Sequence, residues 1–434
     1  MEYYGTRLFR GPRMRVTIAT VSVLGLCLAA AYHGPLAAAN GTPQAKAASP
    51  AWSVRVDPLQ EPSGSHSSGP RLRDSERGVL LSWVEHSGDS TTLKFAEKQA
   101  SGWSRPTAVS SGANWLVSAA DPPIVLRRSD GTLVASWQVS TDKRLEGSDI
   151  YLTYSKDNGQ TWAPPFKPHH DPTRGQHAFP SLFEVPGNTL GLVWLDARAQ
   201  AAHPDDLEAS ISLRYAAFDG SWKQTADAEI DPRVCECCST SSALTSDGVL
   251  VAFRDRSDSE IRDIAVSRLE RGKWTPATLV HADNWEIDAC PVNGPMLSAR
   301  GRQAVVAWFT VKKDQGQAWA AFSSDAGRTW GAPIRLDDAA SLGRVGVDLL
   351  DDGSAVATWV EYANRRAQFS MRHIDPAGQR SAAVSIAAAS TSTSSDVPRI
   401  ARHGRELVFA WTEGAATGDR DAASSVHTAR AILP

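Results

Sequence analysis

The sequence predicts an all-β fold, a β-propeller of four-stranded antiparallel blades, with seven blades by repeat count and six as the alternative. Two observations predict it. A short apolar run that ends in an aromatic residue recurs every 51 to 59 residues, and turn residues flank each run, as is typical of buried strands. Helical periodicity is almost absent from the 434 residues. About four short strands per repeat of this length are typical of propeller blades.

Each apolar run is expected to be the second strand of its blade, as in GVLLSWVE from residue 78 and GSAVATWVE from residue 353. The aromatic residues that mark these strands are Trp83, Trp137, Trp194, Phe253, Trp308, Trp359 and Trp411. A strand often opened by proline precedes each run, and a third strand and a turn with Gly and Trp follow it. The last repeat ends after its third strand. Residues 52–58 are therefore expected to supply the missing fourth strand and close the ring, which removes exposed sheet edges.

The N-terminus predicts export. Arginines at 7, 10, 13 and 15 precede a 16-residue apolar run (16–31) and a small-residue segment that ends at Ala39, the order of a signal peptide. This run is shorter than the roughly 20 residues that span a bilayer, so no membrane span is expected after signal removal. The sequence predicts a periplasmic or secreted monomer with a signal peptide at 1–39, a flexible lead-in at 40–68 and the propeller at 69–434.

The charge excludes one class of partner. The whole chain has a net charge of −3, and removal of residues 1–39 takes away four arginines and one glutamate, which leaves 41 − 47 = −6. A mildly acidic chain has no basic face with which to replace the counterions of a phosphate backbone. No nucleic-acid partner is expected.

Two turns share a specific motif. SKDNGQTW at 155–162 and SSDAGRTW at 323–330 both fit S-x-D-x-G-x-T-W. This motif resembles the Asp box, or BNR repeat, of the sialidase (neuraminidase) superfamily, and the resemblance covers nearly all of the chain after the signal. Asp157 and Asp325 are expected to hold the turn backbone, while the glycines allow positive φ. The boxes are therefore interpreted as structural, and the resemblance implies a carbohydrate-active or carbohydrate-binding propeller.

Polar residues are expected to gather at one face of the ring, here called the mouth face. In a four-stranded meander the first strand begins, and the second ends, at the same face, where binding residues concentrate. The first-strand starts carry His66, Asp121, His177, Cys238, Cys290 and Asp396; past the second strands come Glu85, His86, Asp196, Arg198, Arg254, Asp255, Arg256, Glu361 and Glu413. From these and their neighbours, the candidate catalytic residues are Asp196, Asp255 and Glu260, and the candidate substrate-binding residues are Arg198, Arg254, Arg256, Asp121 and Asn293.

The resemblance implies an exo-glycosidase that holds a substrate carboxylate with three arginines, uses a Tyr paired with a Glu as nucleophile, and uses an Asp as acid and base. Guanidinium groups match a carboxylate geometrically, and a neutral Tyr avoids repulsion from an anionic sugar. The chain departs from this pattern. Ser68 stands where the first-blade motif would place an arginine before Pro70, and none of the four tyrosines after the signal opens a late first strand. The sequence leaves open whether the glycan or small-molecule ligand is also turned over.

The stretch RVCECCSTSS places Cys235, Cys237 and Cys238 within four positions. With Cys27 in the signal peptide, only Cys290 remains elsewhere. Thiolates are soft ligands that select copper or zinc, so these four cysteines with His177 form a candidate metal or redox site, with copper or zinc as its cofactor. Disulfides that join neighbouring inner strands are the structural alternative. Three functions stay open: a carbohydrate-active or carbohydrate-binding protein, a soft-metal or redox protein, and a non-enzymatic binding module with structural disulfides.

Overall fold

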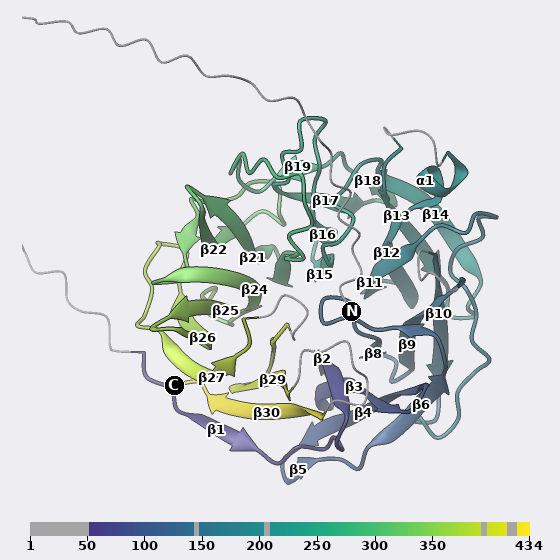
Figure 1. The fold of residues 1–434 in the computed structure, drawn as a ribbon, viewed down its shortest axis with the longest axis horizontal. Helices are drawn as coiled ribbons and strands as arrows, with labels where there is room; N and C mark the ends of the chain where they lie inside the picture. The colour runs from purple at the N-terminus through teal and green to yellow at the C-terminus, as the bar shows by residue number, and fades with distance from the viewer. Residues whose placement is uncertain (1–51, 143–146, 204–208, 392–396, 415–422) are drawn as a thin grey trace, which may run out of the picture. The chain divides into compact units, whose positions relative to one another are not determined.

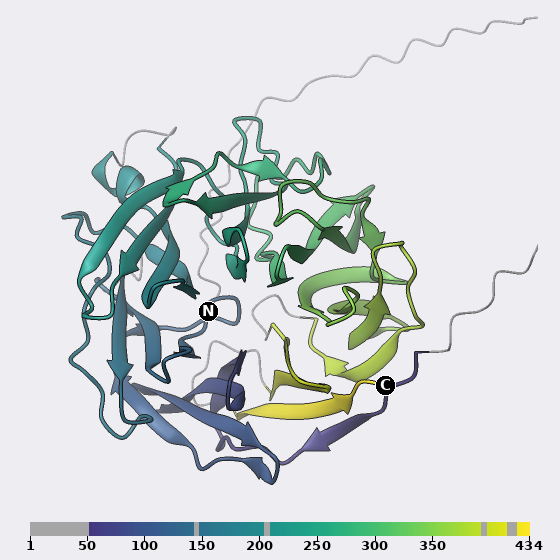
Figure 2. The same ribbon diagram turned by 180° about the vertical axis from the view of Figure 1, so that it is seen from behind.

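The computed structural model describes residues 52–434 except 143–146, 204–208, 392–396 and 415–422. The predicted signal peptide, the first part of the lead-in and Asp396 lie outside the described residues. Seven small antiparallel sheets surround a common axis (Figures 1 and 2), which confirms the predicted all-β propeller and the count of seven blades. The described part of the chain holds one short α-helix, α1 (Arg198–Ala202). No helix in this part has the length and apolarity needed to cross a membrane.

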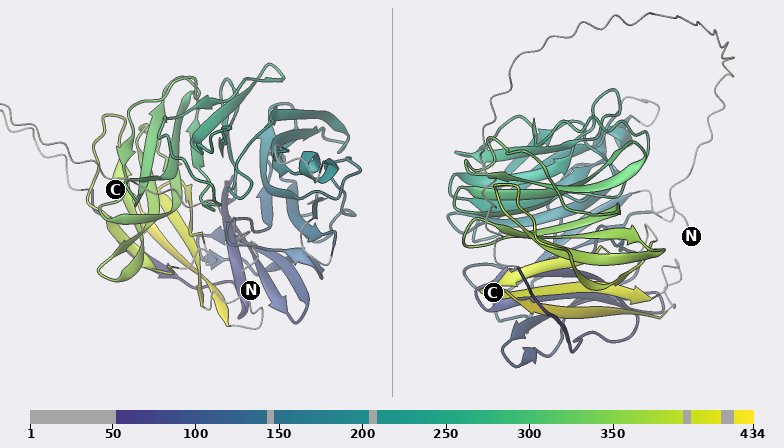
Figure 3. Two further views of the ribbon diagram at one scale, coloured as in Figure 1. Left: turned by 45° about the horizontal axis from the view of Figure 1, so that its top comes forward. Right: turned by 90° about the vertical axis from the view of Figure 1, so that its left-hand side faces the viewer.

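Each blade is a meander whose first strand lies nearest the axis, and the strands run from one face of the ring to the other (Figure 3). The first three blades contain β2 (Ser67–Ser75), β3 (Gly78–Ser87), β4 (Ser90–Gln99), β5 (Gly102–Trp103) and β6 (Thr107–Gly112); β7 (Trp115–Leu116), β8 (Ile124–Arg127), β9 (Leu133–Ser140) and β10 (Ser148–Ser155); and β11 (His177–Val185), β12 (Thr189–Asp196), β13 (Ser212–Phe218) and β14 (Gln224–Asp231).

The next three blades contain β15 (Ser241–Thr245), β16 (Gly248–Arg254), β17 (Ile264–Glu270), β18 (Lys273–Trp274) and β19 (Thr278–Leu279); β20 (Met296–Arg300), β21 (Gln303–Lys312), β22 (Gln315–Ser323) and β23 (Ile334–Arg335); and β24 (Ala340–Leu349), β25 (Ala355–Ala363), β26 (Arg366–Ile374) and β27 (Val384–Ala389). The seventh blade contains β28 (Arg399–His403), β29 (Glu406–Gly414), β30 (Ser424–Ile432) and β1 (Val56–Leu59).

The ring is closed by the N-terminal strand of the described unit. β1 pairs antiparallel with β30, with Val56 opposite Ala431 and Leu59 opposite Thr428 (Figure 1). The closing strand overlaps residues 52–58 but lies a few residues later than the sequence suggested. The seventh blade is therefore built from both ends of this unit, and β30 has no open edge along the paired residues.

The repeated aromatic residues of the second strands form the core between blades, and Trp83, Trp194, Trp308 and Trp359 are almost completely buried. In three blades the buried indole N–H also donates to a carboxylate two residues later, at the end of the same strand. These pairs are Trp83 with Glu85 (3.0 Å), Trp194 with Asp196 (2.8 Å) and Trp359 with Glu361 (3.0 Å). Because a buried indole needs an acceptor, the repeat fixes an acidic side chain at the mouth end of these strands.

The two Asp-box-like turns have the same hydrogen bonds. Ser155 Oγ donates to Asp157 (2.7 Å) and accepts from the backbone N–H of Gly159 (2.8 Å), while the N–H and hydroxyl of Thr161 donate to the same carboxylate (2.9 and 2.6 Å). The turn at Asp325 repeats these contacts. The hydroxyl of Thr161, followed by the other donors, lowers the pKa of Asp157 to about 2. Both turns follow a third strand, so they lie at the face opposite the mouth face.

Candidate functional site

The three cysteines before β15 come together at the mouth face. The backbone N–H of Cys235 donates to the carbonyl of Arg254 (3.0 Å), which holds this segment beside the end of β16. A turn at residues 236–237 then brings the Sγ atom of Cys235 to 3.8 Å from that of Cys237 and 3.5 Å from that of Cys238. All three sulfur atoms lie within 4.8 Å of one another and are buried. Cys290, partly exposed, packs against them from the segment before β20.

The four described cysteines are free thiols in this structure. The sulfur separations are far longer than the roughly 2.05 Å of a disulfide bond, so the predicted structural disulfides are not formed here. Hydrogen bonds from Cys237 and Cys238 lower the pKa of Cys235, and the charge of Arg254 acts in the same direction. Burial raises the pKa of Cys238. The cluster therefore favours the thiolate form at Cys235 over the thiolate form at Cys238.

Arginines and glutamates surround these thiols. Arg262 Nη1 lies 3.5 Å from the sulfur of Cys235 and 3.1 Å from Glu236. Glu260, a predicted catalytic residue, accepts hydrogen bonds from both Arg262 (2.8 Å) and Arg256 (2.7 Å). Arg256, predicted to bind substrate, directs two of its nitrogens at Glu260. The structure thus brings Glu260 and Arg256 together, and they form hydrogen bonds mainly with each other and with Arg262.

Arg254 and Asn293 link neighbouring blades. The guanidinium of Arg254 is buried and donates to the backbone carbonyls of Arg262 (2.6 Å), Asn293 (2.7 Å) and Phe309 (2.8 Å). The Asn293 side chain accepts from the backbone N–H of Arg344 (2.8 Å) in the sixth blade. In this structure the polar atoms of Arg254 and Asn293 bind backbone between blades four, five and six, and their role in substrate binding stays a prediction.

Asp255 differs from the other predicted catalytic residues because no arginine among the described residues forms an ion pair with it. Its carboxylate accepts the backbone N–H of Arg256 (2.8 Å). Burial, followed by repulsion from Asp231, raises the pKa of Asp255 to about 6. A carboxyl group with this pKa can exchange a proton near neutral pH, as a general acid or base must.

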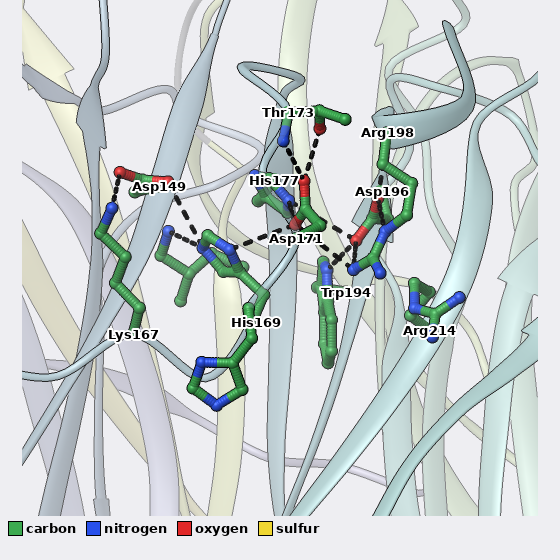
Figure 4. Close-up of polar contacts among 12 residues, drawn as sticks. Asp149, Lys167, His169, Asp171, Thr173, His177, Trp194, Asp196, Arg198 and Arg214 are labelled. Carbon is green, nitrogen blue, oxygen red and sulfur yellow. Dashed lines mark hydrogen bonds and ion pairs between the residues drawn. The ribbon is translucent and has the colours of Figure 1, made fainter. Parts of the chain in front are cut away.

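His177 begins β11 and belongs to a histidine–aspartate cluster in the third blade (Figure 4). Its Nε2 lies 2.8 Å from Asp171, its Nδ1 lies 2.7 Å from the carbonyl of Ser148, and its ring stacks on His169 at 3.7 Å between centroids. His177 is thus grouped with Asp149 and His169, and with Asp171 and Asp196, rather than with the cysteines. The prediction that His177 shares a ligand set with the cysteines is therefore not met.

Asp196 and Arg198 belong to the same cluster. Asp196 is fully buried, lies opposite His177 in the β11–β12 pairing, and accepts hydrogen bonds from Arg198 Nε (2.8 Å) and Nη2 (2.7 Å). The predicted catalytic carboxylate and substrate-binding guanidinium thus neutralise each other (Figure 4). Beside them lies a cleft of about 480 Å³, lined by His170, Asp171, Pro172, Thr173, Arg198, Ala199, Ala202, His203 and Asp227.

Sequence reasoning missed a pair of arginines on the innermost strands. Arg71 of β2 lies opposite Ser82, and Arg399 of β28 lies opposite Ala410, so each faces the residue before its blade's repeat tryptophan. The two strands are neighbours, and both charges act on Asp121. Burial, followed by repulsion from Arg399, lowers the pKa of Arg71 well below its ordinary value. The Pro-Arg dipeptides at 70–71 and 398–399 were the available signal.

Asp121, a predicted substrate-binding residue, is buried before β8. One carboxylate oxygen accepts from the backbone N–H of Phe179 (2.6 Å) and from the side chain of Gln138. The other oxygen is buried without a hydrogen-bond partner among the described residues. Asp121 therefore contributes a single negative charge beside two arginines.

Comparison with known proteins finds no matching family model and no matching curated protein. Among solved structures, the polysaccharide lyase Uly1 matches at 10% identity, over 84% of this chain and 90% of that one, with a TM-score of 0.50. The fold is the only property this likeness establishes. The α-L-arabinofuranosidase Arb93A from Fusarium graminearum matches at 13% identity over 88% and 97% (TM-score 0.46), and a mutant of NanB sialidase from Streptococcus pneumoniae at 9% over 87% and 94% (TM-score 0.44).

Proposed function

We propose that this chain is an exported, periplasmic or secreted propeller that is carbohydrate-active or carbohydrate-binding, and that it takes a sugar carboxylate at Arg71 and Arg399. The observation that carries the proposal is the charge of this pair. The charges of two guanidinium groups on neighbouring inner strands both act on Asp121, a carboxylate that already accepts hydrogen bonds from Phe179 and Gln138.

An anionic ligand relieves the repulsion between these arginines. The lowered pKa of Arg71 expresses the cost of holding its charge beside Arg399 in a desolvated place. Its Nε is buried and has no hydrogen-bond partner among the described residues. A carboxylate can accept paired, charge-assisted N–H···O bonds from a guanidinium, which a neutral sugar hydroxyl cannot match. The fold likeness to a polysaccharide lyase supports a carbohydrate ligand.

The ligand class can be tested by titrating the protein calorimetrically with sialylated and uronic-acid oligosaccharides and with matched neutral oligosaccharides. Arg71→Gln and Arg399→Gln are the test variants. Arg328→Gln is the control, because Arg328 lies on the Asp-box-like turn at the opposite face and pairs with Asp247 (2.6 Å). We expect binding of an acidic glycan that weakens with salt and falls about 10- to 100-fold in each test variant, since a bond to a charged group contributes about 1.5–3 kcal/mol.

Two results would refute the proposal. Neutral and acidic oligosaccharides could bind equally, or both test variants could keep full affinity while their melting temperatures show that they are folded. Turnover is measured on the same oligosaccharides, with Asp255→Asn as the variant, because Asp255 has the pKa that suits proton transfer. Loss of turnover with retained binding in this variant would identify the chain as an enzyme.

A further inference from the structure

We propose that Cys235, Cys237 and Cys238, with Cys290 as a fourth ligand at the surface, bind one thiophilic d¹⁰ cation, Cu(I) or Zn(II). The proposal does not depend on glycan binding, because the thiols and the Arg71–Arg399 pair belong to different blades. These four residues are here called the thiol site.

The sulfur positions fit a single ion. The Zn–S bond is about 2.3 Å, so two ligands of a tetrahedral site stand about 3.8 Å apart. The Sγ atom of Cys235 lies 3.8 Å from that of Cys237 and 3.5 Å from that of Cys238, and all three lie within 4.8 Å of one another. The backbone already holds this geometry through the bond from Cys235 N–H to the Arg254 carbonyl. Little rearrangement is needed to place one ion among the three sulfurs.

The surroundings suit an anionic metal–thiolate centre. Three thiolates with Cu(I) carry a charge of −2, and four with Zn(II) also carry −2. Arg262 Nη1 lies 3.5 Å from Cys235 Sγ, so a positive charge stands beside the thiols. Metal binding requires deprotonated sulfur, so nearby cations promote it. The ligands are sulfur atoms, and soft sulfur ligands select copper(I) or zinc over hard cations such as magnesium or calcium.

Cys290 supplies the path by which an ion enters. Cys235, Cys237 and Cys238 are each 1–2% exposed, whereas Cys290 is partly exposed and its thiol interacts with that of Cys237. Its sulfur also lies 3.8 Å from Glu236. An ion captured by Cys290 at the surface can therefore transfer to the buried trio. Three sulfurs suffice for Cu(I), and Cys290 completes the four ligands that Zn(II) takes in structural sites.

Disulfide bonds fit these four cysteines less well than one shared ion does. The sulfurs of Cys235 and Cys238 lie 3.5 Å apart, and a bond between them would leave Cys237 to pair with Cys290. Adjacent Cys237 and Cys238 are a poor pair because a bond between them is strained. The trio is thus better suited to share one ion than to form bonds in pairs.

The test uses the full chain, purified anaerobically without chelator, and reduced. Metal content, free thiols and protons released on metal addition are measured. Affinities come from competition with bicinchoninate for Cu(I) and with a colorimetric chelator for Zn(II). Cys237→Ser and Cys238→Ser remove buried ligands, Cys290→Ser removes the surface ligand, and Ser239→Ala is the matched control beside the cluster.

We expect one equivalent of cation, release of two or more protons, a thiolate-to-copper absorption band with Cu(I), and at least a 100-fold loss of affinity in Cys237→Ser and Cys238→Ser. Cys290→Ser should weaken Zn(II) strongly and Cu(I) only a few-fold; equal loss of both still supports the site and makes Cys290 a ligand for either ion. The proposal is overturned if the wild-type chain loses both ions to the competitors at one equivalent, or if the isolated chain holds a Cys235–Cys238 disulfide and binds no ion after reduction. Wild-type measurements decide this even if a variant fails to fold, and Arg71→Gln should bind metal normally.

Discussion

Replacing Arg254 by methionine should strongly destabilise the propeller, because Arg254 links the fourth blade to the fifth. Methionine keeps an unbranched apolar chain that can still pack on Trp285, whose ring the guanidinium stacks over at 5.0 Å. The substitution removes every donor from the carbonyls of Arg262, Asn293 and Phe309. The carbonyls of Arg262 and Phe309 then lose this donor in a buried place, and the carbonyl of Asn293 loses it in a partly buried one.

The size of the effect follows from these contacts. A hydrogen bond to a charged group contributes about 1.5–3 kcal/mol, and an unsatisfied buried acceptor costs about 1–3 kcal/mol. Relaxation and water entry recover part of the sum, so we expect a loss of about 4 kcal/mol in the free energy of unfolding. The unfolding entropy is about 2.1 cal/mol/K per residue, or about 0.8 kcal/mol/K for the unit from Trp52 to Pro434. The melting temperature should therefore fall by about 5 °C.

The assay is calorimetric melting of the reduced, metal-free protein, with Arg256→Met as the matched control. Arg256 pairs with the half-exposed Glu260 (2.7 Å), and a pair of this kind contributes at most about 1 kcal/mol, or roughly 1 °C. The reasoning fails if Arg254→Met melts within 1 °C of the wild type. If that variant also loses affinity for an acidic glycan, Arg254 is a ligand-binding residue, as the sequence suggested.

Three further substitutions test the physical account of the fold. Asp157→Asn should lower the melting temperature at pH 7 and make the melting temperature fall less steeply between pH 5 and pH 2. The Asp157 carboxylate has a native pKa of about 2, so it stabilises the fold above its unfolded pKa and no longer does so below about pH 2. An unchanged pH profile would contradict this. Burial, followed by the charge of His177, lowers the pKa of His169 to about 4, so acid favours the unfolded chain between about pH 6.5 and pH 4, by up to about 1.4 kcal/mol per pH unit. The melting temperature of His169→Gln should therefore change less with pH in that window. An equal slope would refute the lowered pKa of His169. Gly191→Ala would place its Cβ 2.2 Å from the Phe183 ring. Overpacking of this kind costs about 1–3 kcal/mol, so the free energy of unfolding measured in urea should fall by that amount. An unchanged free energy would mean that the blade repacks freely.

The fold could be predicted because each blade repeats the same physical demand. A second strand buried on both faces reads as a continuous apolar run, and its closing tryptophan occupies the space between blades, as Trp83 and Trp194 do. The indole N–H then needs an acceptor, which explains why Glu85 and Asp196 follow two residues later. The acidic residues that looked like rim ligands in the sequence are in these blades partners of the core.

The site was harder to predict, because strand ends fix position but not side-chain direction. Cys238 and His177 both lie near the starts of first strands, which suggested a shared site. The β11–β12 pairing sets His177 opposite Asp196 in its own blade, and Asp171 takes its Nε2. Nothing in the spacing of residues tells whether a guanidinium will meet a carboxylate, as Arg198 does, or backbone carbonyls, as Arg254 does.

A bulge explains why Arg71 escaped a search by spacing, whereas the pairing of Arg399 in β28 is regular. In β2 the pairing register shifts between Ser68 and Arg71, so counting back from Pro70 lands on the wrong side of the irregularity. A bulge adds a residue and changes which side chain faces the partner strand or the axis. The register also shifts within β11 and β24, at the same end of the first strand. Arginine positions on first strands are therefore better assigned from the repeat tryptophan of the paired strand than from the proline.

The blade order also separates the two proposed sites. Arg71 and Arg399 belong to the first and seventh blades, which are neighbours, whereas the thiol trio precedes β15 of the fourth blade. In a ring of seven, the fourth blade is three steps from the first and three from the seventh, and β15 lies across the ring from β2 (Figure 1). Their side chains share no backbone segment. The strand pairings do not join the two sites directly, so a substitution at one site should leave ligand affinity at the other unchanged.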